Sequence, residues 1–436
     1  MTSLHVEIVQ KRESCIEAKT IKQLVHAYLS SFMSLSPGTT ISNSEFDDDS
    51  ALKQDVQSIT LCNLDDGHQI LYISETVMIY HVYTLNSFDS EMETMHDPSS
   101  GEELPAANMW SLPSKEFYGL WESLIYDSRV KEQTLRFVET AFEFSDRGVD
   151  SNIINWNRVV LLHGPPGTGK TSLCRALSQK LSIRLQDRFQ NTQLIEINSH
   201  SLFSKWFSES GKLVFKLFNK IKEIIEDPQI LVCVLIDEVE SLTHARRSAL
   251  SGVEPSDSIR VVNAVLTQID QIKNFPNVLI LTTSNMTSAI DLAFVDRADI
   301  RQYVGPLTEK PIYTIFASCL TELMAKNIVM REQLFSYHVL KEYNFTKNES
   351  TEMSLELLKL ARLSVGLSGR ALRKLPFLAH ALFIDSKTST FSRFLQALRQ
   401  AILKHKEDNK QLTQEQCTNH KSASSDVHVN GDVNGH

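Results

Sequence analysis

The run Val159-Val-Leu-Leu-His-Gly-Pro-Pro-Gly-Thr-Gly-Lys-Thr171 joins an apolar strand pattern to a glycine-rich turn and then to a helical pattern. Residues 164–171 fit the spacing G-x-x-x-x-G-K-[ST]. In this spacing backbone N–H groups turn inward around an anion, and the next helix points its positive end at the same place. A glycine-rich turn that binds nothing is the alternative, but a chance match is seldom flanked by both a buried-type strand and a helix. The run therefore predicts a phosphate-binding loop.

The residue types inside this loop have different tasks in holding a nucleotide. Gly164, Gly167 and Gly169 allow the backbone to turn, because glycine adopts conformations closed to other residues. Lys170 brings a positive charge to the β- and γ-phosphates, and the hydroxyl of Thr171 can ligate Mg²⁺. We predict that ATP is held by Gly164, Pro165, Pro166, Gly167, Thr168, Gly169, Lys170, Thr171 and Ser172.

Composition narrows the classes of protein to which the chain can belong. Its 436 residues suffice for about two to three domains, and 42% hydrophobic with 22% charged residues is ordinary for a soluble globular protein. The net charge of −9 argues against general nucleic-acid binding, although it leaves room for a local basic patch. The six cysteines form no C-x-x-C pair, which argues against a zinc site or a disulfide framework. No run approaches the ~18 apolar residues of a membrane span and no signal pattern opens the chain, so we expect a soluble intracellular protein without a membrane partner.

The order of apolar patterns predicts an α/β fold. Between residues 159 and 304 strand patterns alternate with helical ones, which implies a mainly parallel sheet with helices on both faces, and the chain becomes helical after residue 309. Residues 86–107 are acidic and interrupted by proline and glycine, as linkers are. The predicted domains are a small α/β module (1–100), a linker (101–110), a large nucleotide-binding subdomain (111–308), a helical lid (309–405) and a disordered tail (406–436).

Two polar strand ends supply candidate catalytic groups. An apolar strand ends in Asp237 and Glu238, where Asp237 can hold Mg²⁺ or its waters and Glu238 can polarise an attacking water. An acidic pair at a strand end could instead cap the next helix, but the predicted sheet also carries the phosphate loop, which favours hydrolysis. The strand over 278–283 leads to Asn285, which could orient that water or simply form a turn.

Three arginines are candidates for contacts with a γ-phosphate. Arg297 and Arg301 could reach a neighbouring subunit's nucleotide, or they could pair with Asp296 and Asp299 on a surface loop. Arg370 opens a predicted helix, where its charge opposes the helix dipole. That unfavourable placement suggests an anion as its partner.

Taken together, these motifs resemble those of the AAA+ ATPases over about residues 111–405. Longer runs are similar to the pachytene checkpoint protein 2 homologs, namely those over residues 155–174, 195–214, 293–300 and 366–382. The resemblance implies an AAA+ module, in which a parallel-sheet P-loop ATPase subdomain is followed by a helical lid. A small α/β N-terminal domain precedes this module.

The resemblance also implies roles for single residues in hydrolysis. Asn285 corresponds to the first sensor and Arg370 to the second. The stretch from Asp291 is shorter than the common two-arginine pattern, and only Arg297 aligns with it as an arginine finger. A second finger at Arg301 therefore stays open.

Trp206 and Phe207 are adjacent aromatics in a polar, serine-rich stretch. From the residues alone they could be ordinary packing residues, or they could line a pore and grip a polypeptide by apolar contact. The resemblance implies that Trp206 is the first pore-loop aromatic with Phe207 beside it, and that residues 244–258 form the second pore loop. It places Gly119 and Leu120 where the wider superfamily contacts adenine.

Members of this family are hexameric and use ATP and Mg²⁺ to convert HORMA-domain proteins from the closed towards the open state, often with a HORMA-like adaptor. The resemblance thus implies a homohexamer that recruits such clients through its N-terminal domain. It also implies work in the spindle assembly checkpoint and in meiotic recombination and chromosome-axis control, in the nucleus and the cytoplasm. A nucleic-acid motor or loader is the alternative, against which the acidic charge and the aromatic stretch argue. A scaffold that binds but barely hydrolyses is a third reading, against which Glu238 and Arg297 argue.

Overall fold

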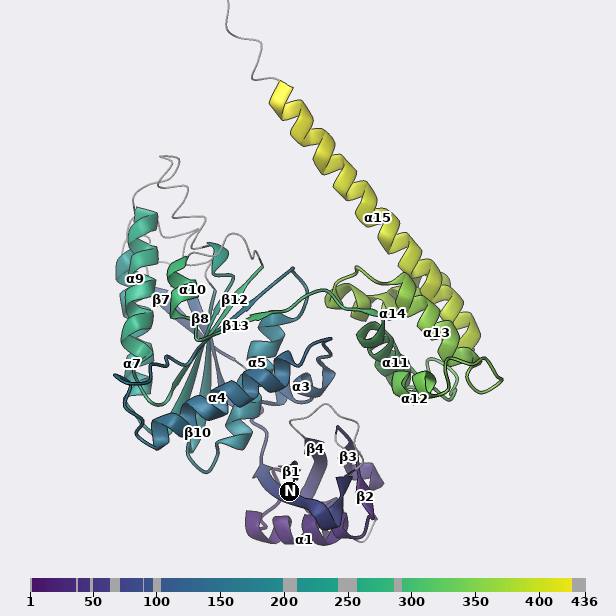
Figure 1. The fold of residues 1–436 in the computed structure, drawn as a ribbon, viewed down its shortest axis with the longest axis horizontal. Coiled ribbons are helices and arrows are strands. Elements are labelled where there is room, and N and C mark those ends of the chain that lie inside the picture. The colour runs from purple at the N-terminus through teal and green to yellow at the C-terminus, as the bar shows by residue number, and fades with distance from the viewer. Residues whose placement is uncertain are drawn as a thin grey trace, which may run out of the picture. The chain divides into compact units, whose positions relative to one another are not determined.

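The computed structural model describes residues 2–36, 38–47, 50–62, 71–88, 90–96, 103–198, 210–241, 257–285 and 292–425. The chain forms two compact units, Met1–Gly305 and Pro306–His436 (Figure 1). Within the described ranges, no helix is both long enough and apolar enough to cross a membrane.

The core of the first unit is a seven-stranded sheet with the order β13-β9-β12-β11-β10-β8-β7. Only β12 separates the phosphate-loop strand β9 from β11, and the three strands run parallel, so their carboxyl ends meet at one edge of the sheet. Before their carboxyl ends, β9, β11 and β12 are wholly apolar, because both faces of the sheet are covered there. The parallel strands are β9 (Val159–His163), β10 (Asn191–Asn198), β11 (Ile230–Asp237), β12 (Val278–Ser284) and β13 (Ile300–Tyr303).

Helices cover both faces of this sheet, and alternate residues of each strand serve the two layers (Figure 1). In β9, Val159 and Leu161 pack in the core under α7 and α9, whereas Val160 and Leu162 pack in the core under α4 and α5. The predicted three-layer α/β architecture is therefore confirmed. The four helices are α4 (Val130–Asp146), α5 (Lys170–Arg184), α7 (Ser210–Ile225) and α9 (Asp257–Ile272).

The predicted linker over 101–110 is wrong, because most of it is a strand of the sheet. β7 (Glu91–His96) and β8 (Glu103–Leu112) form an antiparallel hairpin, and β8 pairs along β10 from Leu112 opposite Thr192. Trp110 and Leu112 are buried by this pairing. Acidic residues and proline, which suggested a linker, are also what the outer strands of a sheet tolerate.

The N-terminal module has a four-stranded sheet with the order β3-β4-β1-β6, packed against α1 (Ala18–Ser30). Helix α1 buries Ile21, Val25 and Leu29, which recur at helical spacing on one face. The sheet strands are β1 (Thr2–Gln10), β3 (Thr40–Ser42), β4 (Val56–Cys62) and β6 (Thr76–Tyr83). A strand pair, β2 (Ser34–Leu35) and β5 (Leu71–Tyr72), and the short helix α2 (Ala51–Asp55) complete the module.

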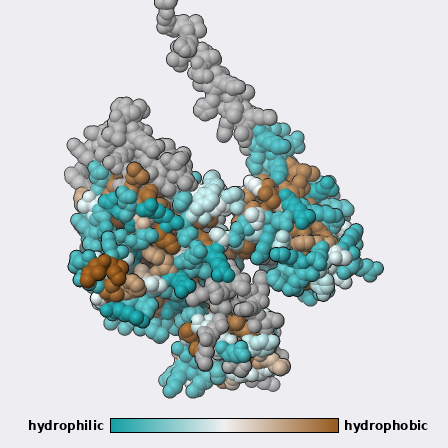
Figure 2. Space-filling model, in the orientation of Figure 1, coloured by the Kyte–Doolittle hydropathy of each residue, from teal (hydrophilic) through white to brown (hydrophobic). Residues whose placement is uncertain are grey.

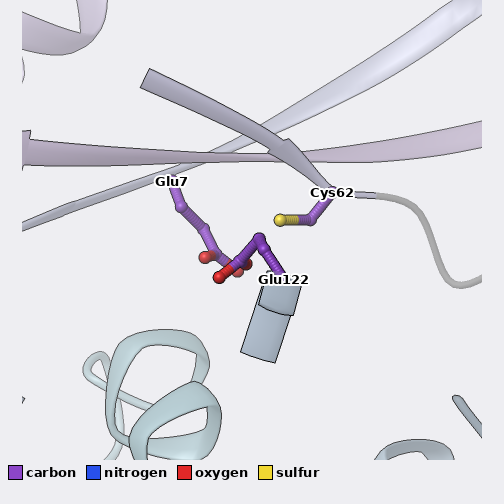
Figure 3. Close-up of side chains that lie close together, drawn as sticks. All are labelled: Glu7, Cys62 and Glu122. Carbon is purple, nitrogen blue, oxygen red and sulfur yellow. The ribbon is translucent and has the colours of Figure 1, made fainter. Parts of the chain in front are cut away.

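A buried ion cluster joins this module to the far end of the phosphate-loop helix. Lys180 of α5 is 2% exposed, and its Nζ lies 2.7 Å from Glu7 Oε2 on β1 and 3.0 Å from Glu122 Oε1 on α3 (Leu120–Ser123). Figure 3 shows Glu7, Cys62 and Glu122 converging, in an arrangement that could hold a metal ion. The Lys180 ammonium also lies 3.4 Å from Cys62 Sγ, so a positive charge already occupies this position. We therefore interpret the cluster as a structural ion pair.

Lys180→Ala is expected to lower the free energy of unfolding by about 3–5 kcal/mol, because buried Glu7 would lose its hydrogen-bonded cation and keep only Arg184 at 3.8 Å. Equilibrium unfolding in urea measures this change. Adding Glu7→Gln to Lys180→Ala should restore part of the loss. Arg147→Ala breaks the exposed pair with Glu143 and should cost less than about 1 kcal/mol. Equal losses for the buried and the exposed pair would contradict this role of Lys180.

The second unit is a small helical domain, as predicted. Helix α12 was missed because six residues are too few to show a periodic pattern. Ser368 accepts a hydrogen bond from the Ala371 backbone N–H at 3.3 Å and so caps the N-terminus of α14. The helices are α11 (Glu309–Ala325), α12 (Tyr337–Glu342), α13 (Glu352–Leu363), α14 (Gly369–Phe383) and α15 (Phe391–Ser425).

Helix α15 continues well past residue 405, so the prediction of a disordered tail from residue 406 is wrong as far as Ser425. The segment is rich in lysine, glutamate and glutamine, which are polar but have high helix propensity. Its surface is hydrophilic where α15 leaves the helical domain (Figure 2). Residues 426–436 lie outside the described residues.

Candidate nucleotide-binding site

The phosphate loop connects the end of β9 to the start of α5, and its backbone is fixed at both ends. Gly164 has φ +143°, and a Cβ there would lie 2.3 Å from the carbonyl oxygen of Val304. Gly169 has φ +93° and precedes α5, and Tyr126 donates its hydroxyl hydrogen bond to the Gly169 carbonyl at 3.1 Å. Glycine is therefore required at both positions. The N-terminus of α5 follows directly, with the unpaired N–H groups that bind phosphate oxygens.

Gly164→Ala is expected to raise the Kd for a fluorescent ADP analogue by at least about 10-fold, because the new methyl group would displace the loop from Val304. Gly148→Ala is the matched control. Gly148 also has a positive φ, +62°, but nothing lies within 4 Å of the place that a Cβ would take, so this variant should carry backbone strain without changing Kd. Similar Kd values for the two variants would show that the close approach at Gly164 does not shape the loop.

The amine of Lys170 lies inside the loop. Lys170 is 4% exposed, and its Nζ donates hydrogen bonds of 2.8 Å to the carbonyl oxygens of Gly164 and Pro165. Burial lowers the pKa of Lys170, and nearby carboxylates, Glu240 foremost, oppose that shift. The group thus remains beside the place where phosphates would bind, as the loop motif predicts.

The two residues predicted to hold Mg²⁺ lie together. The Thr171 hydroxyl donates to Asp237 Oδ1 at 2.8 Å, and the Thr283 hydroxyl donates to the same oxygen. Hydroxyl and carboxylate oxygens are the ligands that Mg²⁺ prefers, so the donor set fits this ion. Thr283 was missed by the sequence analysis. Its signal was the run of hydroxyl residues over 282–284 that follows the aliphatic part of the strand.

Glu238 and Asn285 come together from neighbouring strand ends. Asn285 Nδ2 donates to Glu238 Oε1 at 3.2 Å, and the Glu238 backbone N–H donates to Thr283 Oγ1 at 3.2 Å. Glu238 has φ +58°, a left-handed conformation that costs a non-glycine residue about 1–3 kcal/mol. Such strain persists only where surrounding contacts impose it. The contacts here aim the carboxylate at the edge of the sheet that carries the phosphate loop.

Arg297 ends α10 (Leu292–Arg297) and is held within its own chain. Its Nε and Nη2 donate to Asp270 Oδ1 and Oδ2 at 3.0 and 2.6 Å. Burial raises the pKa of Asp270. Hydrogen bonds from Arg297 and Lys273 outweigh burial and hold that pKa below its ordinary value. Asp270 was not among the partners considered from sequence. Asp299, which was, accepts hydrogen bonds from Asn157 instead.

The remaining candidates belong to other elements or lie outside the described residues. Gly119 has φ +73° and caps the short helix α3, and Leu120 packs partly buried against the α4–α5 core. Arg370 is exposed in the first turn of α14, in the second unit. Arg301 is exposed on β13. Trp206, Phe207 and residues 244–256 lie outside the described residues.

The site combines a phosphate loop, an acidic pair two strands away and an asparagine just past the end of the strand between them. This combination indicates the class of protein. Residues 160–306 match the model of the ATPase family associated with various cellular activities (AAA). The chain is an AAA+ ATPase.

The regions before and after the matched ATPase segment indicate which family of AAA+ ATPases the chain belongs to. Residues 1–88 match the TRIP13 N-terminal domain, and residues 308–406 match the TRIP13-like AAA+ ATPase lid C-terminal domain. The pachytene checkpoint protein 2 homolog of Danio rerio is 56% identical over 366 residues, 84% of this chain and 85% of that protein. The homolog of Gallus gallus is 52% identical over 413 residues, 94% of this chain and 94% of that protein. The homolog of Homo sapiens is 51% identical over 414 residues, 94% of this chain and 95% of that protein. The chain belongs to the pachytene checkpoint protein 2 homolog family.

Solved structures agree with this assignment. The structure of C. elegans PCH-2 is similar with a TM-score of 0.75 and 34% identity, covering 93% of this chain and 100% of that one. A chain from the E. coli MS115-1 HORMA:CdnC:Trip13 complex shares the fold, with a TM-score of 0.52 and 17% identity over 67% of this chain and 94% of that one.

Proposed function

We propose that this chain assembles into a homohexamer that uses ATP hydrolysis to convert HORMA-domain proteins from the closed to the open state, with a HORMA-like adaptor. It would act in spindle assembly checkpoint silencing and maintenance and in meiotic recombination and chromosome-axis control, in the nucleus and the cytoplasm. Family membership along most of the chain supports this proposal. The distantly similar chain from the E. coli MS115-1 HORMA:CdnC:Trip13 complex also supports it.

The observation that carries the hydrolytic part is the pairing of Asn285 with Glu238 beside Asp237. Glu238 would take a proton from the attacking water, and Asn285 would hold the carboxylate and the water in line with the γ-phosphate. Thr171 and Asp237 would hold Mg²⁺, which offsets negative charge on phosphate oxygens. Lys170 would exchange its loop carbonyls for phosphate oxygens when ATP enters.

The proposal further assigns Arg297 to the nucleotide of a neighbouring subunit. In its pair with Asp270, Arg297 is 24% and Asp270 37% exposed, which supports a side chain that another partner can reach. Arg370 would contact the γ-phosphate from the lid. Trp206 and Phe207 would grip a client segment in the central pore. No direct contact with nucleic acid or membrane is part of this proposal.

A conversion assay tests the function. The full-length chain, ATP and Mg²⁺ are added to a closed HORMA-domain protein, with and without a HORMA-like adaptor, and the two client conformers are quantified over time. ATP-dependent conversion that Trp206→Ala reduces more than it reduces basal ATP turnover is expected. ATPase rates with added single- and double-stranded DNA run beside it. DNA-stimulated turnover without client conversion would favour the nucleic-acid motor instead.

A further inference from the structure

The acidic motif at the end of β11 contains a third carboxylate, Glu240. It is 8% exposed and lies three residues beyond Asp237. Its Oε1 accepts a hydrogen bond of 3.0 Å from the backbone N–H of Asn285. Its Oε2 is buried and has no hydrogen-bond partner among the residues that the structure describes. A buried carboxylate with one unsatisfied oxygen calls for a reason beyond packing.

Asn285, the hydrogen-bond partner of Glu240, also contacts Glu238. Asn285 receives two restraints, since Glu240 accepts from its backbone and Glu238 accepts from its side-chain amide. The two glutamates are separated in sequence by Val239 alone, whose backbone N–H donates to the Thr283 carbonyl at 2.9 Å. This hydrogen bond ties the segment to β12, the strand that ends beside Asn285. The asparagine is therefore held between two carboxylates of one short segment.

A carboxylate suits this position better than a neutral group. A charged acceptor makes a stronger and shorter hydrogen bond to a backbone N–H than a neutral acceptor does. Strand β12 ends at Ser284, so Asn285 lacks the support of a ladder partner at the point where its side chain must be aimed. Without Glu240, the Asn285 peptide would be free to rotate, and its amide would lose its fixed direction.

We infer that Glu240 is a positioning residue of the ATPase reaction, acting through Asn285 to fix the Glu238 carboxylate where it receives the proton of the attacking water. This inference rests on the proposed role of Glu238. Glu240 takes no proton in the reaction. Its main contribution is to the orientation of Asn285, so its loss should lower kcat far more than it changes nucleotide affinity, although its charge also acts on Lys170.

A double-mutant cycle between Glu240 and Asn285 tests the inference. Glu240→Ala is expected to lower single-turnover phosphate release by the full-length protein about 10- to 100-fold, with the Kd for ADP within about twofold of the parental value. In an Asn285→Ala background the same substitution should change the rate by less than about twofold, because the residue through which it acts is gone. Equal rate losses in both backgrounds would overturn the inference.

Conservative variants separate orientation from stability. Glu240→Gln keeps an oxygen that can accept from Asn285, and it should recover most of the rate that Glu240→Ala loses. Glu196→Gln removes the charge of a mostly buried carboxylate from the same sheet, on β10, and should leave the rate near the parental value. If Glu240→Ala lowers the melting temperature but leaves kcat intact, Glu240 is only structural and the inference fails. Parental turnover by Glu238→Gln would refute the proposed base, whereas the cycle reports on Glu240 and Asn285 alone.

Discussion

Glu238→Gln is expected to bind ATP with the parental affinity and to hydrolyse it at least about 100-fold more slowly. The amide cannot accept a proton from water at neutral pH, but it has the shape of the carboxylate and an oxygen that can accept from Asn285. The phosphate loop and the Thr171–Asp237 pair would be unchanged. ATP should therefore stay bound, and ring assemblies should accumulate with client attached.

Phosphate release and the Kd for ATP measure the two halves of this prediction separately. Glu226→Gln is a matched control, because Glu226 is an exposed residue just after α7 and the same chemical change there should alter neither quantity. Hydrolysis by Glu238→Gln at the parental rate would remove Glu238 from its proposed role. Loss of ATP binding instead would mean that Glu238 shapes the pocket rather than the reaction.

Arg297→Ala is expected to reduce hydrolysis by about 10³-fold or more, the effect of losing an arginine that offsets charge at the transferring phosphate. The substitution also frees Asp270, which needs its own control. Asp270→Asn weakens the same ion pair but keeps the arginine, and it should retain hydrolysis. If Asp270→Asn were as inactive as Arg297→Ala, the arginine would matter through that ion pair and not through a nucleotide.

Mixing the two inactive variants tests whether the site is shared. In a ring, an Arg297→Ala subunit keeps its own Glu238 and can receive an arginine from a Glu238→Gln neighbour. Random mixing in equal amounts would complete roughly a quarter of the interfaces, and activity should reappear in the mixture. A mixture as inactive as its components, despite verified subunit exchange, would place Arg297 in the site of its own chain.

The parts of the site that sequence predicted correctly are those set by local spacing and strand order. The phosphate loop has a fixed spacing, and parallel strands bring their carboxyl ends to one edge, so Asp237 and Thr171 had to lie close together. The same reasoning placed Asn285 near Glu238.

What sequence could not supply are partners chosen by tertiary packing. The Asp270–Arg297 pair joins two helices, and no spacing rule connects them. Lys180 is a lysine late in a helix, a position that is typically solvated, yet it is buried by a module more than a hundred residues earlier in the chain. The acidic segment near residue 103 has the composition of a linker, and its pairing with β7, continued along β8 by the pairing with β10, makes it a strand.

The buried cluster around Lys180 has a consequence for how the chain can be divided. Arg184, one turn further along α5, is likewise buried and lies 3.8 Å from Glu7. A truncated protein that begins after the N-terminal module would lose Glu7, the carboxylate next to both cations, and would leave Lys180 and Arg184 with Glu122 and Glu139 as their partners. The module and the nucleotide-binding core should therefore melt in a single cooperative transition. Removing the contacts of the module with the end of α5 should also destabilise the start of this helix, which follows the phosphate loop.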